Sequence, residues 1–164
     1  MSQVWFITGA SRGLGRAIAQ RVLEHGDYVV ATARKVAVLS GLVDQFGKQV
    51  ETLPLDVTDE QAVNSAIATA KEHFGRIDVL VNNAGYADMA PAEEMAMSSF
   101  KNQMDTDFYG TLYTVRAVLP LMRAQKSGRI LNVTSIGGRI GSAGLSAYQS
   151  AKFAVEGLTE VLAK

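Results

Sequence analysis

Apolar residues follow two alternating patterns along the chain. Short runs of β-branched and aromatic residues, such as VWFI at 4–7, have the length and composition of buried strands. Between these runs, longer segments repeat their apolar residues every three or four positions, as amphipathic helices do. The pattern predicts strands over 4–7, 27–34, 50–54, 76–81 and 129–133. It predicts helices over 16–23, 36–46, 58–74 and 98–125, with room for one break in the last of these, and a final helix from 146 onward.

This order of elements predicts an α/β fold. Parallel strands need long crossover connections, usually helical, and such βαβ units are right-handed. We therefore expect one Rossmann-like domain over residues 1–164, with a doubly wound parallel sheet of five strands in the order 3-2-1-4-5. Ligands of such sheets bind beyond the carboxyl ends of the strands, near the switch between strands 1 and 4. Thr58 is expected to cap its helix, and 86–97 to form a loop over a cleft.

The turn after the first strand has the pattern T-G-x-x-x-G-x-G over 8–15, with glycines at 9, 13 and 15. A glycine turn between a strand and a helix can present backbone N–H groups and a helix N-terminus to a phosphate. The alternative is a strand-to-helix turn that is rich in glycine for purely structural reasons. The spacing differs from the dinucleotide pattern G-x-G-x-x-G.

The end of the second strand bears on the choice of cofactor. Sites for NAD usually carry an acid about 20 residues beyond the glycines, where it binds the ribose 2′-hydroxyl. Here that position is Ala33, followed by Arg34 and Lys35, and Arg12 lies in the glycine turn. A guanidinium can pair with a 2′-phosphate, so the sequence favours NADP(H) over NAD(H). The alternative is that these cations are ordinary solvated charges.

Polar residues also follow strands 3 and 4. Asp56 could accept a hydrogen bond from the amine of an adenine, or could simply cap the next turn. Asn82-Asn83-Ala84-Gly85 suits a tight turn against a flat ligand, although such turns are common.

Ser135 follows the fifth strand, and Tyr148 and Lys152 are four positions apart in the final helix. That spacing places both on one helical face, where the lysine ammonium favours the phenolate form of the tyrosine. Such a tyrosine can exchange a proton with an alkoxide near neutral pH, and Ser135 could hold the substrate oxygen. A tyrosine–lysine pair at this spacing is also frequent on protein surfaces.

Composition narrows the range of functions. The 16 basic and 16 acidic residues balance, which argues against nucleic acid or an anionic membrane as a partner. There is no cysteine, and His25 and His73 are far apart, so no disulfide or metal site is expected. No apolar run approaches the length of a membrane helix, and because the chain opens on a predicted strand we expect no signal peptide. We expect a cytoplasmic protein.

These motifs, in this order and spacing, resemble the short-chain dehydrogenase/reductase family across nearly the whole chain. The resemblance implies hydride transfer to or from a nicotinamide, interconverting a carbonyl and a secondary alcohol. It implies that Tyr148 is the acid/base, that Lys152 acidifies it and binds the ribose, and that Ser135 orients the substrate oxygen. The cofactor-binding residues implied are Gly9, Ser11, Arg12, Gly13, Leu14, Gly15, Arg34, Asp56, Val57, Asn83, Ala84, Gly85, Tyr148 and Lys152.

Two features depart from the family pattern. Asp107 stands where the family commonly has an asparagine that holds a water of a proton relay, so we count it among the catalytic candidates. The chain stops at Lys164, inside the last helix, and is expected to be the N-terminal portion of a longer catalytic domain. The substrate, a small carbonyl or alcohol, is therefore not named. A catalytically impaired dinucleotide-binding or interaction module is the alternative function. The family also suggests a homodimer or homotetramer.

Overall fold

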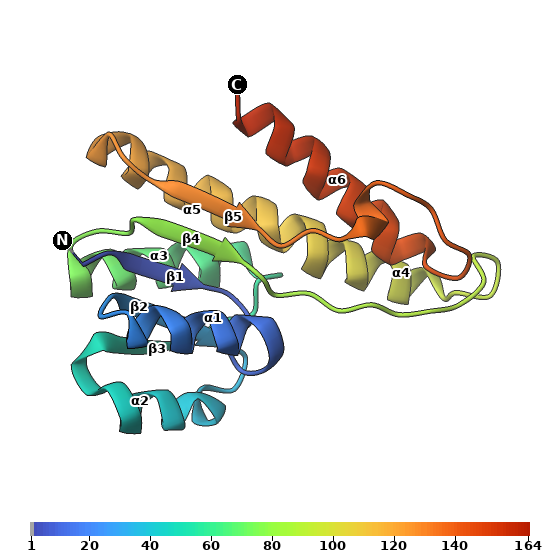
Figure 1. Ribbon diagram of the computed structural model, residues 1–164. Helices are drawn as coiled ribbons and strands as arrows, with labels where there is room; N and C mark the ends of the chain where they lie inside the picture. The colour runs from blue at the N-terminus through green and yellow to red at the C-terminus, as the bar shows by residue number, and fades with distance from the viewer. Residues whose placement is uncertain (1) are drawn as a thin grey trace.

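The computed structural model describes residues 2–164 and contains the expected parallel sheet (Figure 1). Its strands lie in the order β3-β2-β1-β4-β5, and all neighbours pair in parallel. The strand bounds are β1 Val4–Ile7, β2 Tyr28–Ala33, β3 Val50–Pro54, β4 Val79–Asn82 and β5 Arg129–Asn132. The predicted strand order is thus confirmed, and the observed strands begin or end within a few residues of their predicted bounds.

Helices connect the strands and cover both faces of the sheet. The α-helices are α1 Gly13–Glu24, α2 Ser40–Phe46, α3 Glu60–Phe74, α4 Met97–Met104, α5 Gly110–Gln125 and α6 Ser146–Leu162. Short 3₁₀ turns lie at η1 Val36–Leu39, η2 Gly47–Gln49 and η4 Ile136–Gly138, and a π-helical turn, η3, at Asp105–Tyr109. In Figure 1, α1 lies in front of the sheet and α2 below β3, whereas α3 and α5 lie behind the sheet. Residues of α1 and α2 pack in the same core cluster.

The core has two layers because successive strand residues point to opposite faces. Phe6 packs with residues of α3 and α5, whereas the adjacent Ile7 packs with residues of α1, η1 and α2. Both side chains are completely buried. This alternation explains why short, almost continuous apolar runs form the central strands of a sheet covered on both faces.

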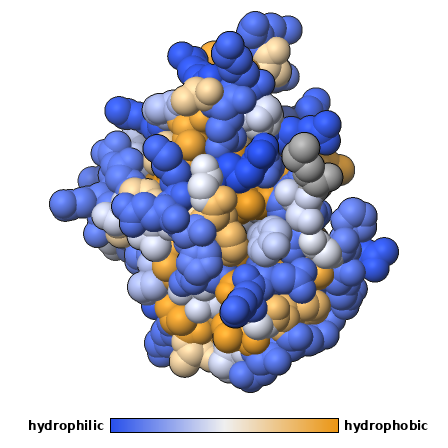
Figure 2. Space-filling model, turned by 90° about the vertical axis from the view of Figure 1, so that its left-hand side faces the viewer, coloured by the Kyte–Doolittle hydropathy of each residue, from blue (hydrophilic) through white to orange (hydrophobic). Residues whose placement is uncertain are grey.

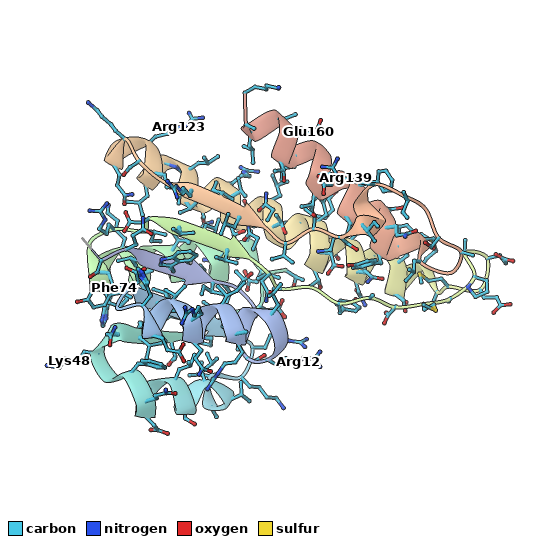
Figure 3. The ribbon with its side chains drawn as sticks, in the orientation of Figure 1. Arg12, Lys48, Phe74, Arg123, Arg139 and Glu160 are labelled. Carbon is cyan, nitrogen blue, oxygen red and sulfur yellow. The ribbon has the colours of Figure 1, made fainter. Side chains whose placement is uncertain are left out.

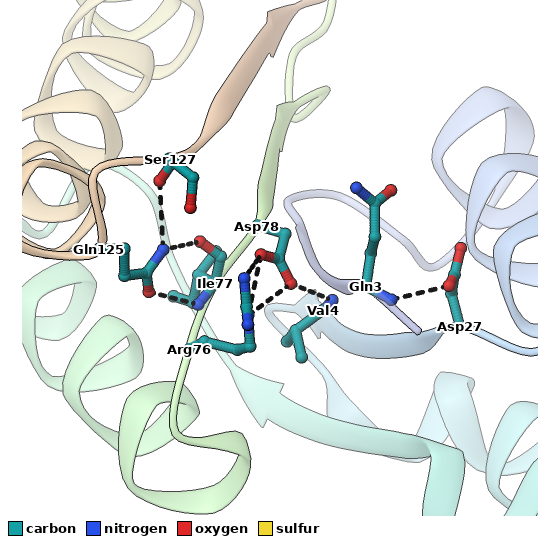
Figure 4. Close-up of polar contacts among 8 residues, drawn as sticks. All are labelled: Gln3, Val4, Asp27, Arg76, Ile77, Asp78, Gln125 and Ser127. Atoms are coloured by element: carbon teal, nitrogen blue, oxygen red, sulfur yellow. Dashed lines mark hydrogen bonds and ion pairs between the residues drawn. The ribbon is translucent and has the colours of Figure 1, made fainter. Parts of the chain in front are cut away.

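A group of polar contacts closes the amino edge of the sheet (Figure 4). The carboxylate of Asp78 accepts a hydrogen bond from the backbone N–H of Val4 at 2.9 Å and pairs with the guanidinium of Arg76. The side chain of Gln125 binds both the N–H and the carbonyl of Ile77, at 3.2 and 3.0 Å. These contacts satisfy backbone groups at the edge opposite to the one where ligands are expected.

One local expectation differs from the structure. Thr58 does not cap α3; Asp59 does, by accepting hydrogen bonds from the N–H groups of Gln61 and Ala62. The predicted long helix is present, and at the break for which the pattern left room the π-helical turn η3 joins α4 directly to α5. A π-helical turn adds a residue to a helix without ending it, so hydrophobic periodicity alone does not reveal it.

The surface is largely hydrophilic on the face at the amino ends of the strands, where apolar residues are interspersed in smaller areas (Figure 2). The edge strand β5 is less covered than the central strands, and Leu131 is exposed. Across residues 2–164, none of the helices is long and apolar enough to cross a membrane.

Candidate functional site

The glycine turn between β1 and α1 needs its glycines for two different reasons. Gly9 and Gly13 have positive φ angles of 66° and 56°, which L side chains rarely adopt. A Cβ on Gly15 would overlap the side-chain amide of Asn83, so this position must lack a side chain for close packing. A Cβ on Gly13 would meet nothing within 4 Å, because this part of the turn faces open space.

The turn after β4 holds the glycine turn in place. The backbone N–H groups of Asn83 and Ala84 both donate to the hydroxyl of Thr8 at 3.0 Å. The side-chain amide of Asn83 donates to the carbonyls of Thr8 and Gly9, at 3.0 and 3.1 Å. Asn83 therefore holds the glycine turn in place through its side chain. The sequence motif alone did not show whether Asn83 has this structural role or contacts a ligand.

A cavity of about 720 Å³ opens at the carboxyl edge of the sheet, above these two turns. It is lined by Gly9, Ser11, Arg12, Gly13, Leu14, Ala33, Arg34, Leu55, Asp56, Val57, Thr58, Asn83, Ala84, Gly85, Tyr86, Asn102, Asp105 and Thr106. Most of the predicted cofactor-binding residues are thus brought together around one space. Gly15 is an exception, because it is buried beneath the turn.

The sequence reasoning missed the wall that α4 and η3 contribute to this cavity. Asn102, Asp105 and Thr106 line it, although Asp107 was the only residue of this helix predicted to belong to the site. Polar residues on one side of an amphipathic helix are expected whether that side faces solvent or lines a ligand site. No sequence motif distinguishes a solvated face from a ligand site here, and only the position of the helix in the fold shows that these residues line the cavity.

Two basic residues stand among the lining residues of the cavity. Arg34 follows β2 and Arg12 precedes α1, and both are exposed. Figure 3 shows Arg12 projecting from the carboxyl edge, far from Arg123. Among the ion pairs within residues 2–164, neither Arg12 nor Arg34 takes part, so both remain available to an anionic ligand. Asp56 lines the cavity too, but it also accepts hydrogen bonds from the N–H and hydroxyl of Thr58, at 3.0 and 2.8 Å.

A smaller cavity of about 210 Å³ continues from the first one toward α6. The two share Asn83, Gly85 and Tyr86 as lining residues, and the smaller one adds Ala87, Val133, Thr134, Tyr148 and Lys152. The predicted tyrosine and lysine therefore face a space that adjoins the larger cavity at the turn after β4. Ser135 and Asp107 do not line either cavity.

Tyr148 and Lys152 are neighbours on one face of α6. The Lys152 ammonium lies 5.7 Å from the centre of the Tyr148 ring and donates a hydrogen bond to the carbonyl of Val133 at 2.9 Å. Only 6% of Lys152 is exposed. Burial lowers the pKa of its ammonium below the usual value, and the charge of Asp107 acts in the opposite direction.

Ser135 begins the loop that leads to α6. Its hydroxyl oxygen accepts a hydrogen bond from the N–H of Gly137 at 3.1 Å and so starts the 3₁₀ turn η4. Further along the loop, the side chain of Gln149 accepts a hydrogen bond from the N–H of Ser142 at 2.6 Å. These contacts fix the loop that joins the predicted serine to the helix of the tyrosine.

Asp107 is completely buried in the π-helical turn η3. Its Oδ1 accepts a hydrogen bond from the N–H of Tyr86 at 3.1 Å, whereas its Oδ2 has no hydrogen-bond partner in the part of the chain that the structure describes. A Cβ on Gly85 would lie 3.0 Å from Oδ1 of Asp107 and 3.7 Å from Nζ of Lys152, so both groups flank this glycine. Burial raises the pKa of Asp107 to about 6, even though the Lys152 charge lowers it.

A chain of buried polar side chains ties α6 to the sheet and to α5. The hydroxyl of Thr114 donates to the amide oxygen of Asn82 at 2.6 Å, and the amide nitrogen of Asn82 donates to Asn132 at 2.9 Å. Asn132 in turn donates to the hydroxyl of Thr159 at 2.9 Å. Because Asn82 and Asn132 are paired across β4 and β5, this chain joins the last helix to both strands. No cluster of metal-ligating side chains occurs within residues 2–164.

Comparison with known proteins identifies this arrangement. The family model described as short chain dehydrogenase matches residues 3–164. The chain belongs to the short-chain dehydrogenase family. Oxidoreductase BOA17 of Botryotinia fuckeliana is 53% identical over 165 residues, which cover 100% of this chain and 60% of that protein. A 3-ketodihydrosphingosine reductase of Bacteroides thetaiotaomicron is 40% identical, with 98% of this chain and 57% of that protein covered.

A solved structure supports the same assignment. The crystal structure of a short-chain dehydrogenase from Streptomyces avermitilis matches with a TM-score of 0.96 and 40% identity, over 99% of this chain and 60% of that one. The chain thus spans about 60% of the length of these relatives. The family implies a nicotinamide dinucleotide, and the residues present fit one: the open side of Gly13 and the unpaired arginines, within the described chain, face a cavity of suitable size.

Proposed function

We propose that this short-chain dehydrogenase is an NADP(H)-dependent oxidoreductase that interconverts a carbonyl and a secondary alcohol. The observation that carries the proposal is the convergence of Tyr148 and Lys152 on a cavity that shares its lining with the larger cofactor-sized cavity. An exposed tyrosine–lysine pair elsewhere on a helix would have no such connection. Relatives named as oxidoreductases and reductases agree with a redox function.

The side chains of the chain have distinct roles in this proposal. In the reducing direction, the Tyr148 hydroxyl donates its proton to the substrate oxygen as the carbonyl becomes an alcohol. The Lys152 ammonium stabilises the resulting phenolate, and its attachment to the Val133 carbonyl fixes its position. Ser135 supplies a hydrogen bond to the substrate oxygen once its hydroxyl proton turns toward it. When bound, the nicotinamide supplies or accepts the hydride.

The glycine turn would hold the cofactor's diphosphate through its backbone N–H groups and the N-terminus of α1. Arg34 and Arg12 would pair with the 2′-phosphate that distinguishes NADP(H) from NAD(H). An acid at the end of β2 would repel this phosphate, and Ala33 stands there instead. The preference for NADP(H) therefore rests on charge at one end of the cavity.

The catalytic test replaces the proposed proton donor. Tyr148→Phe removes only the hydroxyl, so we expect turnover of a carbonyl substrate with NADPH to be abolished while NADPH binding is nearly unchanged. Tyr28→Phe is the matched control, because Tyr28 is exposed at the start of β2, away from both cavities. Wild-type turnover in Tyr148→Phe would overturn the reductase mechanism and favour the non-catalytic binding module.

The cofactor test compares NADPH and NADH binding in wild type and Arg34→Ala, followed by Trp5 fluorescence. Loss of one charge-assisted hydrogen bond, worth about 1.5–3 kcal/mol, should weaken NADPH binding roughly 10- to 150-fold and leave NADH binding nearly unchanged. Arg123→Ala is the control, since Arg123 lies at the opposite edge (Figure 3). Equal loss of affinity for both cofactors would contradict recognition of a 2′-phosphate.

A further inference from the structure

Asp107 is a buried carboxyl for which hydride transfer itself provides no task. It lines neither cavity and, unlike the part-exposed Ser135, has no exposed surface, so it does not face a substrate carbonyl. It is nevertheless completely buried, and one of its oxygens has no partner among residues 2–164. Burying an incompletely paired carboxylate costs folding free energy. A nearby opposite charge can offset such a cost, and Lys152 flanks the same Gly85 as Asp107 does.

The position of Asp107 is set from two directions. The N–H of Tyr86 donates to its Oδ1, and the side chain of Gln103 holds the same segment by donating to the carbonyl of Tyr86 at 2.5 Å. Gly85 lies between Asp107 and Lys152 and lacks the side chain that would separate them. The carboxylate and the ammonium therefore flank the same glycine, and the hydrogen bond from Lys152 to the Val133 carbonyl fixes the ammonium there.

We propose that Asp107 is a positioning residue that acts as the counter-ion of Lys152 and keeps this buried lysine protonated while Tyr148 works. This inference rests on the proposed function of Tyr148 and Lys152, and it assigns to Asp107 a task that an uncharged amide at the same place could not perform. The two charges do not touch: the ion pairs within residues 2–164 do not include them. They interact through a short, poorly solvated space beside Gly85, where charges are screened weakly.

The need for a counter-ion follows from the burial of Lys152. Desolvation is the larger influence on its pKa and favours the neutral amine, whereas Asp107 favours the ammonium. A neutral amine would neither stabilise the phenolate of Tyr148 nor bind an anionic or hydroxyl-rich ligand as a cation. Lys152 and Asp88 are the charged groups that act on Asp107, whereas Asp88, Asp105 and Arg34 act with Asp107 on the neighbouring Tyr86. Among the described residues, Lys152 is thus the cation that acts on Asp107.

The arrangement predicts a dependence on pH. Because the pKa of Asp107 is about 6, its carboxylate is charged at neutral pH and becomes neutral below that range. Asp107→Asn imitates the neutral form at every pH. Wild type and Asp107→Asn should therefore reduce a carbonyl at similar rates below about pH 6. Above that pH their rate profiles should diverge, and the fall in rate on the alkaline side should occur at lower pH in the variant.

The decisive experiment titrates Lys152 directly in the protein without added cofactor. Lysine labelled with ¹³C at Cε is followed by NMR from neutral to alkaline pH, and the Lys152 resonance is identified by its absence from Lys152→Met. We expect its titration midpoint to lie at lower pH in Asp107→Asn than in wild type. Asp44→Asn, which removes the charge of an exposed acid on α2, should leave the midpoint unchanged.

The outcomes of the Lys152 titration can be told apart from those of the catalytic test on Tyr148→Phe. An unchanged or higher Lys152 midpoint in Asp107→Asn would overturn the counter-ion role, whatever the protein's activity. A lower midpoint together with the displaced alkaline limb would support it. If no variant, including wild type, reduces a carbonyl, the proposed function fails, while the NMR titration still decides whether Asp107 controls the charge of Lys152.

Discussion

Replacing Asp107 by asparagine should stabilise the protein at neutral pH. The carboxyl group is completely buried, and its pKa rises from an ordinary value of 3.8 to about 6. The folded state therefore binds the Asp107 proton more tightly than the unfolded state does, and ionisation of the carboxyl disfavours folding. Each pH unit of difference corresponds to about 1.4 kcal/mol, so the penalty for the charged form is about 3 kcal/mol.

The sign of this effect fixes its pH window. Above about pH 6 the carboxylate is charged in both states, and the full penalty is present. As the pH falls through the window between about 6 and 3.8, the folded state gains its proton first and the penalty disappears. Asparagine has nearly the same shape and no charge, so it avoids the penalty throughout. The unfolding free energy of Asp107→Asn should exceed that of wild type by about 3 kcal/mol at pH 7.5, by about half of this at pH 5, and by little at pH 4.

Urea denaturation of both proteins at these pH values measures the difference, provided that the m-values agree. Asp105→Asn is the matched control, because it removes the same charge from the same π-helical turn but at an exposed position. A stability difference that is independent of pH would refute the reasoning, as would a variant that is less stable than wild type at neutral pH. A gain in stability from removing a functional charge would be an instance of the trade-off between stability and activity.

Three further predictions concern packing and assembly. Gly15→Ala should weaken nucleotide binding and destabilise the fold, because the new methyl group overlaps the side chain of Asn83. Isothermal titration with NADPH measures the first loss and thermal unfolding the second. Unaltered NADPH binding would contradict the packing argument. Asn132→Ala leaves the side-chain N–H of Asn82 without its acceptor and removes the donor to the Thr159 hydroxyl, so it should cost about 1–3 kcal/mol in urea denaturation. A smaller cost would mean that water replaces the lost contacts. Sedimentation should show self-association of the whole protein, and an exclusively monomeric protein at high micromolar concentration would rule out the homodimer or homotetramer.

The sequence was sufficient for the elements and their order. Each central strand is a short apolar run, and each helix has its own apolar periodicity, so both are encoded by residues that are close together in the chain. The right-handed βαβ rule then leaves few arrangements, and the order 3-2-1-4-5 was among them. The convergence of Arg34, Asp56 and Asn83 on one cavity could likewise be predicted, because the carboxyl ends of parallel strands meet at one edge.

The detailed environment of each side chain could not be predicted in this way. Asp107 was identified by its place in a motif, but its burial beside Gly85 and Lys152 depends on the π-helical turn and on contacts among three separate segments. The link from Asn82 to Asn132 joins residues fifty positions apart and has no local signature. Local patterning decides which element forms, because it depends on neighbouring residues. Desolvation, hydrogen-bond partners and charge depend on what packs against an atom, and only the tertiary structure determines that.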